Sequence, residues 1–395
     1  MKKVLLFIIA ISIFCSVCSI PVVGVVAQAK VGESGFISNT KSPSFYLVDY
    51  DSGTVLLEKN AEEKRPIASM VKIMTLVLTF KAINEGKLSY DEMLTISETA
   101  AGMGGSQMFL DVGEKYSVND LIKGVVVCSA NDAAAALGER ISGSVEAFVQ
   151  YMNDYAISLN MLNTKFCNAT GLPNSGEQYS TAKDVTTMLR ELLKNKKYFE
   201  YSKIWMEDYI HPDGRKTEMV NTNKLIRFYK DCDAGKTGFT NEAMFCLSAS
   251  ARVNDMRVIA TVLGSPDSKT RFKEVTDLFK YAFANYENKV LLRANETLSA
   301  DVSVNKAKDV PIEVYCEKDI KYFCKKGENK DYKVSVCIFD NLTAPISKET
   351  PLGMVRVTRS DGEIICEGKI YSRNDIPKAT YKDALEKVLR NWLIK

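Results

Sequence analysis

The order of apolar and polar residues predicts a β-hairpin and a buried helix early in the chain. Apolar runs at 44–49 and 54–57 flank the turn Asp51-Ser52-Gly53, which is typical of a hairpin with a glycine-bearing turn. From Met70 to Ile83, apolar residues recur on nearly every side of a helix. Because a helix that is apolar all round is buried, we expect this one at the centre of its domain.

The next block, residues 88–200, has helical periodicity with polar connections, and we expect an all-helical insertion there. Its clearest helical segments are 120–127, 132–141 and 145–159. Two fully apolar runs follow and predict buried strands at 244–251 and 256–263. Strands on both sides of a helical block predict one α/β unit that distant segments of the chain close.

Beyond residue 286 the pattern changes to short segments in which apolar and polar residues alternate. They are separated by turns and lie at 302–304, 312–315, 333–336 and 354–357. Alternation with a period of two directs one face of each strand into a core. We therefore expect a small β-sandwich in this part of the chain.

The last residues, Thr380–Lys395, predict a terminal helix by the spacing of their apolar positions. The apolar positions are Leu385, Val388, Leu389, Trp392 and Leu393, with Lys382, Lys387, Arg390 and Lys395 among the polar ones. Two interpretations stay open at this point. The helix packs on its own domain, or it lies in a membrane surface, which the tryptophan and the basic residues favour.

The first 29 residues have the composition of an export signal. Lys2 and Lys3 precede the apolar run 4–14, and residues 27–29 give the small-x-small pattern of a cleavage site. A retained membrane anchor is the alternative, because the apolar stretch up to Val26 is long enough to span a bilayer. Both interpretations place the remainder of the chain outside the cytoplasm.

Composition and charge narrow the class of protein. With 395 residues, 46% hydrophobic and 26% charged, the chain fits a globular protein of two or three domains. Without Lys2 and Lys3 the net charge falls from +3 to about +1, so charge gives no support for a nucleic-acid partner. The cysteines after the leader include no Cys-x-x-Cys pair, so we expect no metal. We expect most of them to be buried free thiols, although an exported protein permits disulfides.

A single histidine, His211, limits the chemistry open to this chain. It excludes a multi-histidine metal site, and a Ser-His-Asp hydrolase would have to use this one imidazole. Ser69-Met70-Val71-Lys72 offers another nucleophile, because residues three apart at the start of a helix share a face. The Ser69 hydroxyl would also lie among unpaired backbone N–H groups at the positive end of the helix dipole, which favours a developing oxyanion.

Lys72 can act as a base only if its pKa is lowered. An ordinary lysine, with a pKa of about 10.4, is almost fully protonated at neutral pH. Burial at the mouth of an apolar helix and a second cation nearby both lower the pKa of a lysine. Lys236 is the natural candidate for that second cation.

Two further fragments follow along the chain. Ser129-Ala130-Asn131 lies between two predicted helices, where Asn131 or Asp132 simply caps the second helix, or Ser129 carries a proton. In the second interpretation the Asn131 amide holds Lys72 and the substrate amide. Lys236-Thr237-Gly238 heads a stretch that becomes strand-like at Phe245, and its glycine would let a substrate strand approach closely.

With all three fragments in this order, the chain resembles the penicillin-recognising serine enzymes. Around them, segments such as 105–110, 129–134 and 221–223 are similar to the low-molecular-mass D-alanyl-D-alanine carboxypeptidases over nearly the full mature length. The resemblance implies an α/β (α+β) transpeptidase-like domain with a helical insertion, followed by a small all-β domain. The expected parts are a signal peptide at 1–29, a catalytic domain at 30–285, a β-sandwich at 286–376 and an amphipathic helix at 377–395.

The resemblance implies acyl transfer by the first two motifs. Ser69 would attack the carbonyl between two D-alanines, with Lys72 as the base. Ser129 would pass the proton to the leaving D-alanine. The backbone N–H groups of Ser69 and Phe239 would form the oxyanion hole.

Recognition of the substrate's terminal carboxylate is implied for the third motif. Lys236 and Thr237 would bind it, on the same strand as Gly238, and Arg271 matches an arginine that supports this recognition in the family. A solvated surface arginine is the alternative for Arg271. The chain departs from the family in two places, with Asp233-Ala234-Gly235 before the motif and Phe239 after it. Only the Phe239 amide is needed for the oxyanion hole, so we expect the mechanism to survive.

The resemblance implies a serine D-Ala-D-Ala carboxypeptidase acting on peptidoglycan stem peptides, inhibited covalently by β-lactams and using no cofactor. We expect it at the outer face of the bacterial membrane or in the wall. Alternatives are a β-lactamase-like hydrolase, a DD-endopeptidase and an inactive wall-binding scaffold. Residues 168–174 lack the Glu-x-x-Leu-Asn deacylation loop of class A β-lactamases. The extra β domain argues against an endopeptidase, and the intact motifs argue against a scaffold.

Overall fold

A five-stranded antiparallel sheet frames the first part of the molecule. The computed structural model describes residues 39–173, 176–308, 311–328 and 332–393, so the signal peptide predicted at 1–29 lies outside the described residues. The strand order is β2-β1-β9-β8-β7, which joins the hairpin at 44–59 to strands almost 200 residues later. The strands are β1 (Ser44–Asp49), β2 (Val55–Lys59), β7 (Cys232–Thr240), β8 (Met244–Val253) and β9 (Met256–Ser265). The predicted hairpin and the predicted closure by distant strands are therefore confirmed.

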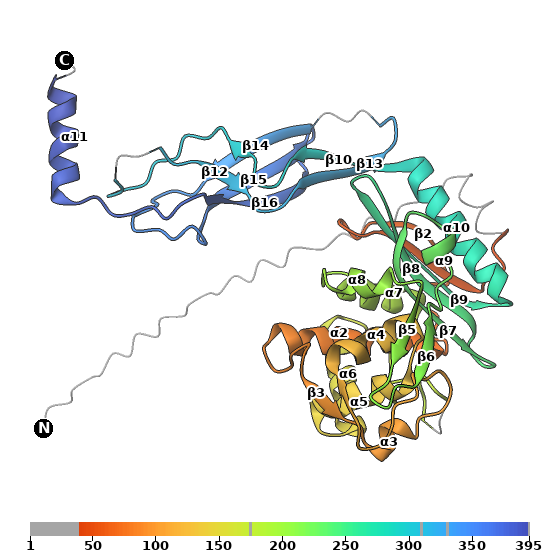
Figure 1. Ribbon diagram of the computed structural model, residues 1–395. Helices are drawn as coiled ribbons and strands as arrows, with labels where there is room; N and C mark the ends of the chain where they lie inside the picture. The colour runs from red at the N-terminus through yellow and green to blue at the C-terminus, as the bar shows by residue number, and fades with distance from the viewer. Residues whose placement is uncertain (1–38, 174–175, 309–310, 329–331, 394–395) are drawn as a thin grey trace, which may run out of the picture. The chain divides into compact units, whose positions relative to one another are not determined.

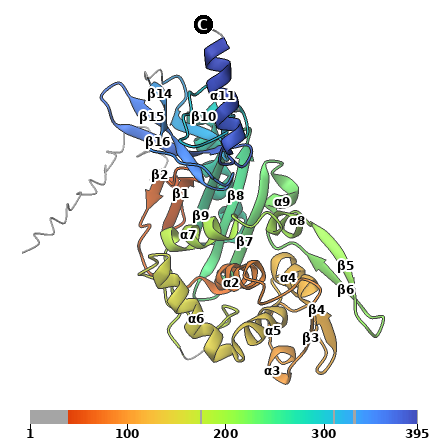
Figure 2. The same ribbon diagram turned by 90° about the vertical axis from the view of Figure 1, so that its left-hand side faces the viewer.

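Helices cover both faces of this sheet (Figures 1 and 2). Helix α10 (Ser268–Asn285) packs on β8 and β9, and α7 (Ala182–Leu192) packs on β1, β8 and β9 from the other side. Next to α7 lies α2 (Lys72–Asn84), preceded by the 3₁₀ turn η1 (Ala68–Val71). Ten of the thirteen residues of α2 are buried, which confirms the prediction of a central helix that is apolar on nearly every side.

The predicted all-helical block contains a small hairpin as well, so that expectation is wrong. β3 (Met93–Thr95) pairs with β4 (Lys115–Ser117), and each strand has one buried residue, too few to produce a periodic signal. A second unpredicted hairpin, β5 (Met206–Ile210) and β6 (Lys216–Val220), follows the block. The remaining helices here are α3 (Glu98–Ala101), α4 (Val118–Val127), α5 (Asn131–Ser142), α6 (Val145–Ser158), α8 (Tyr198–Ser202) and α9 (Leu225–Phe228).

From residue 286 to residue 372 the described chain is built of strands, as predicted, in a two-stranded and a five-stranded sheet. The orders are β10-β13 and β11-β12-β16-β15-β14, and their core includes Val314, Leu352 and Ile370. The strand predicted at 302–304 is absent, whereas several observed strands were not predicted. The bounds are β10 (Tyr286–Leu292), β11 (Thr297–Leu298), β12 (Val314–Cys316), β13 (Ile320–Lys325), β14 (Tyr332–Ile338), β15 (Pro351–Arg359) and β16 (Ile364–Ser372).

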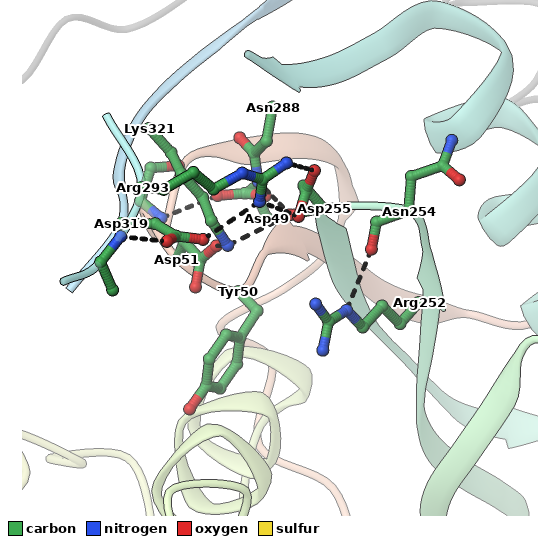
Figure 3. A network of polar contacts seen from close by, with 12 residues as sticks. Asp49, Tyr50, Asp51, Arg252, Asn254, Asp255, Asn288, Arg293, Asp319 and Lys321 are labelled. Atoms are coloured by element: carbon green, nitrogen blue, oxygen red, sulfur yellow. Dashed lines mark hydrogen bonds and ion pairs between the residues drawn. The ribbon is translucent and has the colours of Figure 1, made fainter. Parts of the chain in front are cut away.

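A network of ion pairs and hydrogen bonds joins the first sheet to β10 and β13 (Figure 3). Both terminal nitrogens of Arg293 donate to the Asp255 carboxylate at 3.0 Å, and Lys321 Nζ donates to Asp51 Oδ2 at 2.9 Å. Deeper in, Asn288 Nδ2 donates to Asp49 Oδ1 at 3.2 Å. A groove of about 970 Å³ borders this junction network, and its lining includes none of the residues predicted to act in catalysis.

The eight cysteines among the described residues are free thiols, as predicted. We expected most of them to be buried, but only half of them are: Cys232, Cys246, Cys316 and Cys324. Burial raises the pKa of the Cys128 thiol, which neighbours Ser129, to about 11. This thiol is therefore protonated at neutral pH and unreactive as a nucleophile.

The chain's terminal helix, α11 (Tyr381–Leu393), exposes apolar residues along its length. Leu385, Val388 and Leu389 are between 49% and 61% exposed, and Trp392 is 84% exposed. The alternative in which these residues pack on their own domain is therefore wrong. Among the described residues, no helix has both the length and the hydropathy that crossing a bilayer requires.

Candidate active site

Ser69 lies in the short 3₁₀ turn that leads into the central helix. It is partly exposed between buried neighbours, and the residue before it, Ala68, has the left-handed φ of +47°. Such a conformation is unfavourable for a residue with a Cβ by about 1–2 kcal/mol, so the surrounding structure must hold it. Two glycines permit the close packing: a Cβ on Gly171 would lie 2.0 Å from Ala68 O, and one on Gly238 would lie 2.5 Å from Ile67 O.

Lys72 is completely buried and reaches back to the serine. Its Nζ is 3.1 Å from Ser69 Oγ and donates at 2.6 Å to the carbonyl oxygen of Thr170. Burial, and secondly the positive charge of Lys236, hold the pKa of Lys72 well below its usual value. The arrangement favours a neutral amine beside the hydroxyl, as predicted from the sequence, with Lys236 as the second cation.

Ser129 and Lys236 form a second hydroxyl–amine pair. Lys236 Nζ donates to Ser129 Oγ at 2.7 Å and to the carbonyl oxygen of Thr237 at 3.1 Å. Burial, with a smaller contribution from the charge of Arg271, lowers the pKa of Lys236 to about 7. Ser129 itself has a left-handed φ of +63° in the link between α4 and α5, which makes it the second strained position in the site.

Asn131 does not cap the helix that it begins, so that alternative is wrong. The N-cap of α5 is Ala130, with no side-chain cap hydrogen bond, and Asn131 Nδ2 instead donates to Gly104 O at 2.6 Å. Asn131 Oδ1 is buried and has no hydrogen-bond partner among the described residues. The predicted bond between Asn131 and Lys72 is absent there as well. The buried Oδ1 is an acceptor that a substrate N–H group can satisfy.

Asp132, for which the sequence predicts no role other than helix capping, positions the loop above the site. Its carboxylate accepts the backbone N–H groups of Met108 and Leu110 at 3.2 Å, and it is fully buried. The same loop supplies Ser106 O, which accepts Asn131 N at 2.7 Å. Asp132 therefore fixes residues 104–110 against the start of α5.

The Thr170 carbonyl was likewise not predicted as part of the site. Asn168 Oδ1 accepts the backbone N–H groups of Thr170 at 3.1 Å and Gly171 at 2.6 Å, which closes a local turn. This turn directs Thr170 O to Lys72 Nζ. The Asn-x-Thr-Gly order was a visible turn signal, but the direction of one carbonyl is set by the folded loop.

Lys236-Thr237-Gly238 lies within β7, the edge strand of the sheet, whereas Phe245 belongs to the next strand, β8. The sequence had placed the motif only ahead of a strand-like stretch. Phe239 extends from the end of this edge, 50% exposed, and its ring lies 4.3 Å from that of Phe245. The Phe239 ring is therefore at the surface beside the motif.

Arg271 is buried, so the solvated-surface alternative is wrong. It extends from α10, and one terminal nitrogen donates to Gly238 O at 3.0 Å and to Cys246 O at 3.2 Å. Burial lowers the pKa of Arg271 to about 10, so the side chain keeps its charge at neutral pH. No ion pair of Arg271, Lys236 or Lys72 is present among the described residues. The site thus holds three basic groups and favours an anion.

The single histidine takes no part in this cluster. His211 is buried near the tip of the β5–β6 hairpin, with Nδ1 3.2 Å from Tyr116 Oη and Nε2 2.8 Å from Thr217 Oγ1. Within the described ranges there is no group of three or more His, Cys, Asp or Glu side chains placed to hold a metal.

Comparison with known proteins places these residues in context. A sequence profile described as D-alanyl-D-alanine carboxypeptidase matches residues 29–267, and one described as the penicillin-binding protein 5 C-terminal domain matches 286–378. The chain is 40% identical over 354 residues to the Bacillus subtilis D-alanyl-D-alanine carboxypeptidase DacF, covering 89% of this chain and 90% of that protein. It is 34% identical to DacA of Haemophilus influenzae, covering 85% of each.

Solved structures agree with these similarities. Penicillin-binding protein 5 from Haemophilus influenzae superimposes with a TM-score of 0.66 at 31% identity, over 86% of this chain and 98% of that one. Penicillin-binding protein D2 from Listeria monocytogenes, in its ampicillin-bound form, gives a TM-score of 0.56 at 30% identity, over 62% and 98%. Both the first part of the fold and the all-β part have counterparts in the longer of these structures.

Proposed function

Because the chain belongs to the D-alanyl-D-alanine carboxypeptidase family, we propose that it removes the terminal D-alanine from peptidoglycan pentapeptide through an acyl-enzyme on Ser69. The observation that carries the proposal is the 3.1 Å contact between Ser69 Oγ and the buried amine of Lys72. A lysine whose pKa lies well below its usual value can accept a proton from a neighbouring hydroxyl. The serine therefore has its base within hydrogen-bonding distance before substrate arrives.

Acylation then follows from the two hydroxyl–amine pairs. Ser69 Oγ forms a bond to the carbonyl carbon as its proton moves to Lys72 Nζ, and the negative charge collects on the carbonyl oxygen. The C–N bond breaks as Ser129 Oγ gives its proton to the departing D-alanine nitrogen. The proton taken up by Lys72 then passes to Ser129, which restores both groups, and Lys236, 2.7 Å away, stabilises the Ser129 oxygen during the transfer. Water then hydrolyses the ester, which returns the Ser69 hydroxyl and releases the shortened peptide.

Charge supports recognition of a free carboxylate. Lys236 and the part of the β7 edge formed by Thr237 and Gly238 would receive the terminal carboxylate, and Arg271 donates a hydrogen bond to the backbone of this strand. The basic groups of the site form no ion pair with a carboxylate among the described residues. A negatively charged substrate terminus is therefore stabilised more strongly here than a neutral one. Asn131 Oδ1 would accept an N–H group of the peptide. The backbone N–H groups of Ser69 and Phe239 would form the oxyanion hole, as the family resemblance implies.

The test measures D-alanine release from a short peptide ending in D-Ala-D-Ala. The parent should release D-alanine, Ser69→Ala should not, and Ser158→Ala, at an exposed serine, should match the parent. Mass spectrometry with a β-lactam should show one covalent adduct in the parent and none in Ser69→Ala. Equal release by the parent and Ser69→Ala would reject the assignment.

Release of bound penicillin should be slow. The loop 168–173, which faces Lys72, contains no carboxylate and contributes a backbone carbonyl instead. Deacylation of the bulky penicilloyl group therefore has no second general base there. Rapid turnover of a chromogenic β-lactam would contradict this and favour the β-lactamase-like alternative.

We further propose that the protein is exported. We also propose that α11 lies at the membrane–water interface on the outer face of the bacterial cell membrane. The membrane location is supported by four exposed apolar residues of α11: Leu385, Val388, Leu389 and Trp392. A helix with one exposed apolar face can insert that face into the membrane–water interface. Chains with and without residues 380–395 should differ in sedimentation with anionic vesicles, and equal sedimentation would reject the helix as the anchor. A mature N-terminus other than residue 30 would reject the predicted cleavage.

A further inference from the structure

An aromatic and basic patch lies on the surface near the proposed active site, built by the link before β5 and by α9. Trp205 is partly exposed, and Phe228, at the end of α9, is 72% exposed. Their ring centroids are 6.0 Å apart at 69°, and the Arg227 guanidinium lies 5.3 Å from the Trp205 ring centre and 5.7 Å from that of Phe228. Large aromatic rings held together at a surface mark a binding surface more often than single exposed residues do.

The residues next to the two rings in the sequence include exposed positive charges. Lys203, Lys224, Arg227 and Lys230 are all exposed, and none of them forms an ion pair among the described residues. The one acidic residue in the segment 221–232 is Asp231, which is only partly exposed. We call Trp205, Arg227, Phe228 and the three lysines the Trp205–Phe228 patch. Its chemistry combines flat apolar faces with cations, so it suits a ligand that has apolar faces and carboxylates.

Backbone hydrogen bonds tie the patch to the rim of the proposed active site. Asn221 N donates to Trp205 O at 2.8 Å, and Thr222 N donates to Val127 O at 3.1 Å, two residues before Ser129. Helix α8, which ends just before Trp205, and α9, which contains Arg227 and Phe228, both contact β7, and Figure 2 shows the two helices together beside that strand. The patch and the substrate site thus share one rigid frame.

We propose that the Trp205–Phe228 patch binds the glycan–peptide polymer that carries the scissile stem peptide. The faces of sugar rings would pack on Phe228 and Trp205, and carboxylates of neighbouring stem peptides would pair with Arg227 and the lysines. This rests on the proposed function, because a stem peptide held at Ser69 is covalently continuous with a sugar chain that extends beyond the substrate site. Charge complementarity favours this polymer over a neutral one.

The experiment compares a short soluble substrate with the polymer, using full-length protein. The variant is Arg227→Ala/Phe228→Ala, and the matched control is Phe339→Ala, an exposed aromatic residue after β14. D-alanine release from the short peptide should be unchanged in both. With purified insoluble peptidoglycan, the patch variant should sediment less and release D-alanine with kcat/KM lower by about tenfold, and its binding should depend less on salt than that of the parent.

Three outcomes would overturn the inference. In the first, the patch variant matches the parent on the polymer. In the second, it loses equal activity on both substrates, which shows a structural role. In the third, it loses vesicle binding alone, which identifies a lipid surface. Sedimentation of Ser69→Ala with peptidoglycan separates this inference from the proposed function. If the parent releases no D-alanine but Ser69→Ala still sediments in a patch-dependent way, the carboxypeptidase proposal fails and the polymer site stands.

Discussion

Two polar clusters in this molecule use charge in opposite ways. In the proposed active site, Lys72, Lys236 and Arg271 are buried and donate to neutral oxygens of serines and backbone carbonyls. In the junction network, Arg293 and Lys321 donate to carboxylates and stay partly exposed (Figure 3). Burial without a counter-charge lowers the pKa of the three basic groups of the site, whereas the Arg293 hydrogen bonds lower the pKa of Asp255 and keep it ionised.

The difference shows which cluster is organised for chemistry and which for structure. A neutral or easily deprotonated lysine beside a hydroxyl is useful to a proton transfer but contributes little to stability. A hydrated ion pair stabilises modestly and has no reason to change its proton state. The two clusters should therefore respond oppositely to substitution, the site losing activity and the junction losing stability.

The largest effect is expected from Lys72→Met. Removing the proposed base should lower the rate of acylation by a β-lactam by about 10²–10⁴-fold. The free energy of unfolding should stay within about 1 kcal/mol of the parent or rise, because a buried amine is replaced by an apolar side chain of similar length. Stopped-flow acylation and urea unfolding check both parts, with Lys194→Met, at an exposed lysine, as the control.

A large loss of stability in Lys72→Met, with acylation unchanged, would contradict the contrast between the active site and the junction network. The amine would then be a structural group.

The next effect concerns the backbone that holds the site. Gly171→Ala should lower the free energy of unfolding by about 3 kcal/mol, because φ is +84° and the Cβ would lie 2.0 Å from Ala68 O. Gly86→Ala is the matched control, since φ is +70° there with nothing within 4 Å. It should lose only about 1–2 kcal/mol. Thermal and urea unfolding measure the difference, and equal losses would show that close packing against Ser69 is not needed.

A pH-dependent effect is expected at Lys236. Its pKa is about 7 in the folded protein but about 10.4 in an unfolded chain, so between these values only the unfolded chain holds the proton. Stability should therefore rise with pH across this window by up to about 1.4 kcal/mol per unit from this residue. Urea unfolding at pH 7, 8 and 9 should show a steeper rise in the parent than in Lys236→Met. Parallel curves would mean that the Lys236 pKa is not lowered.

The smallest effect is expected in the junction network. Arg293→Ala removes two hydrogen bonds to Asp255, but Arg293 is 50% exposed, so the loss should be about 1 kcal/mol or less. Salt should reduce the difference further, because it screens exposed charges. Activity on a short peptide should not change. A measurable loss of that activity would show that the junction network affects the active site, and the contrast between the two clusters would no longer hold.

Much of the candidate site was predictable because its residues lie in short, ordered motifs. Ser69 and Lys72 are three apart where the 3₁₀ turn leads into α2, and this local spacing brings them together almost regardless of the rest of the fold. The contact of Lys236 with Ser129 was less local, since 107 residues separate them. The family resemblance implied that both residues act in one site, but their hydrogen bond was not predicted.

Other features had no local signal. Strands β3 and β4 have three residues each, and their pairing with each other stabilises them. They are too short for a periodic pattern in the sequence to predict them. Asn131 has a good capping side chain, yet its amide bonds Gly104 O because the 104–110 loop lies above it. In both cases a contact distant in sequence overrides the local preference.

The sequence by itself determined the central helix, the hairpin, the closing strands and the identity of a serine, two lysines and an arginine that chemistry could use. Only the tertiary structure decided their proton states and the groups between them. Burial lowers the pKa of Lys72 and Lys236, and burial is a property of the packed molecule. The Thr170 carbonyl, 98 residues from Lys72, became part of the site because a folded loop directs it there.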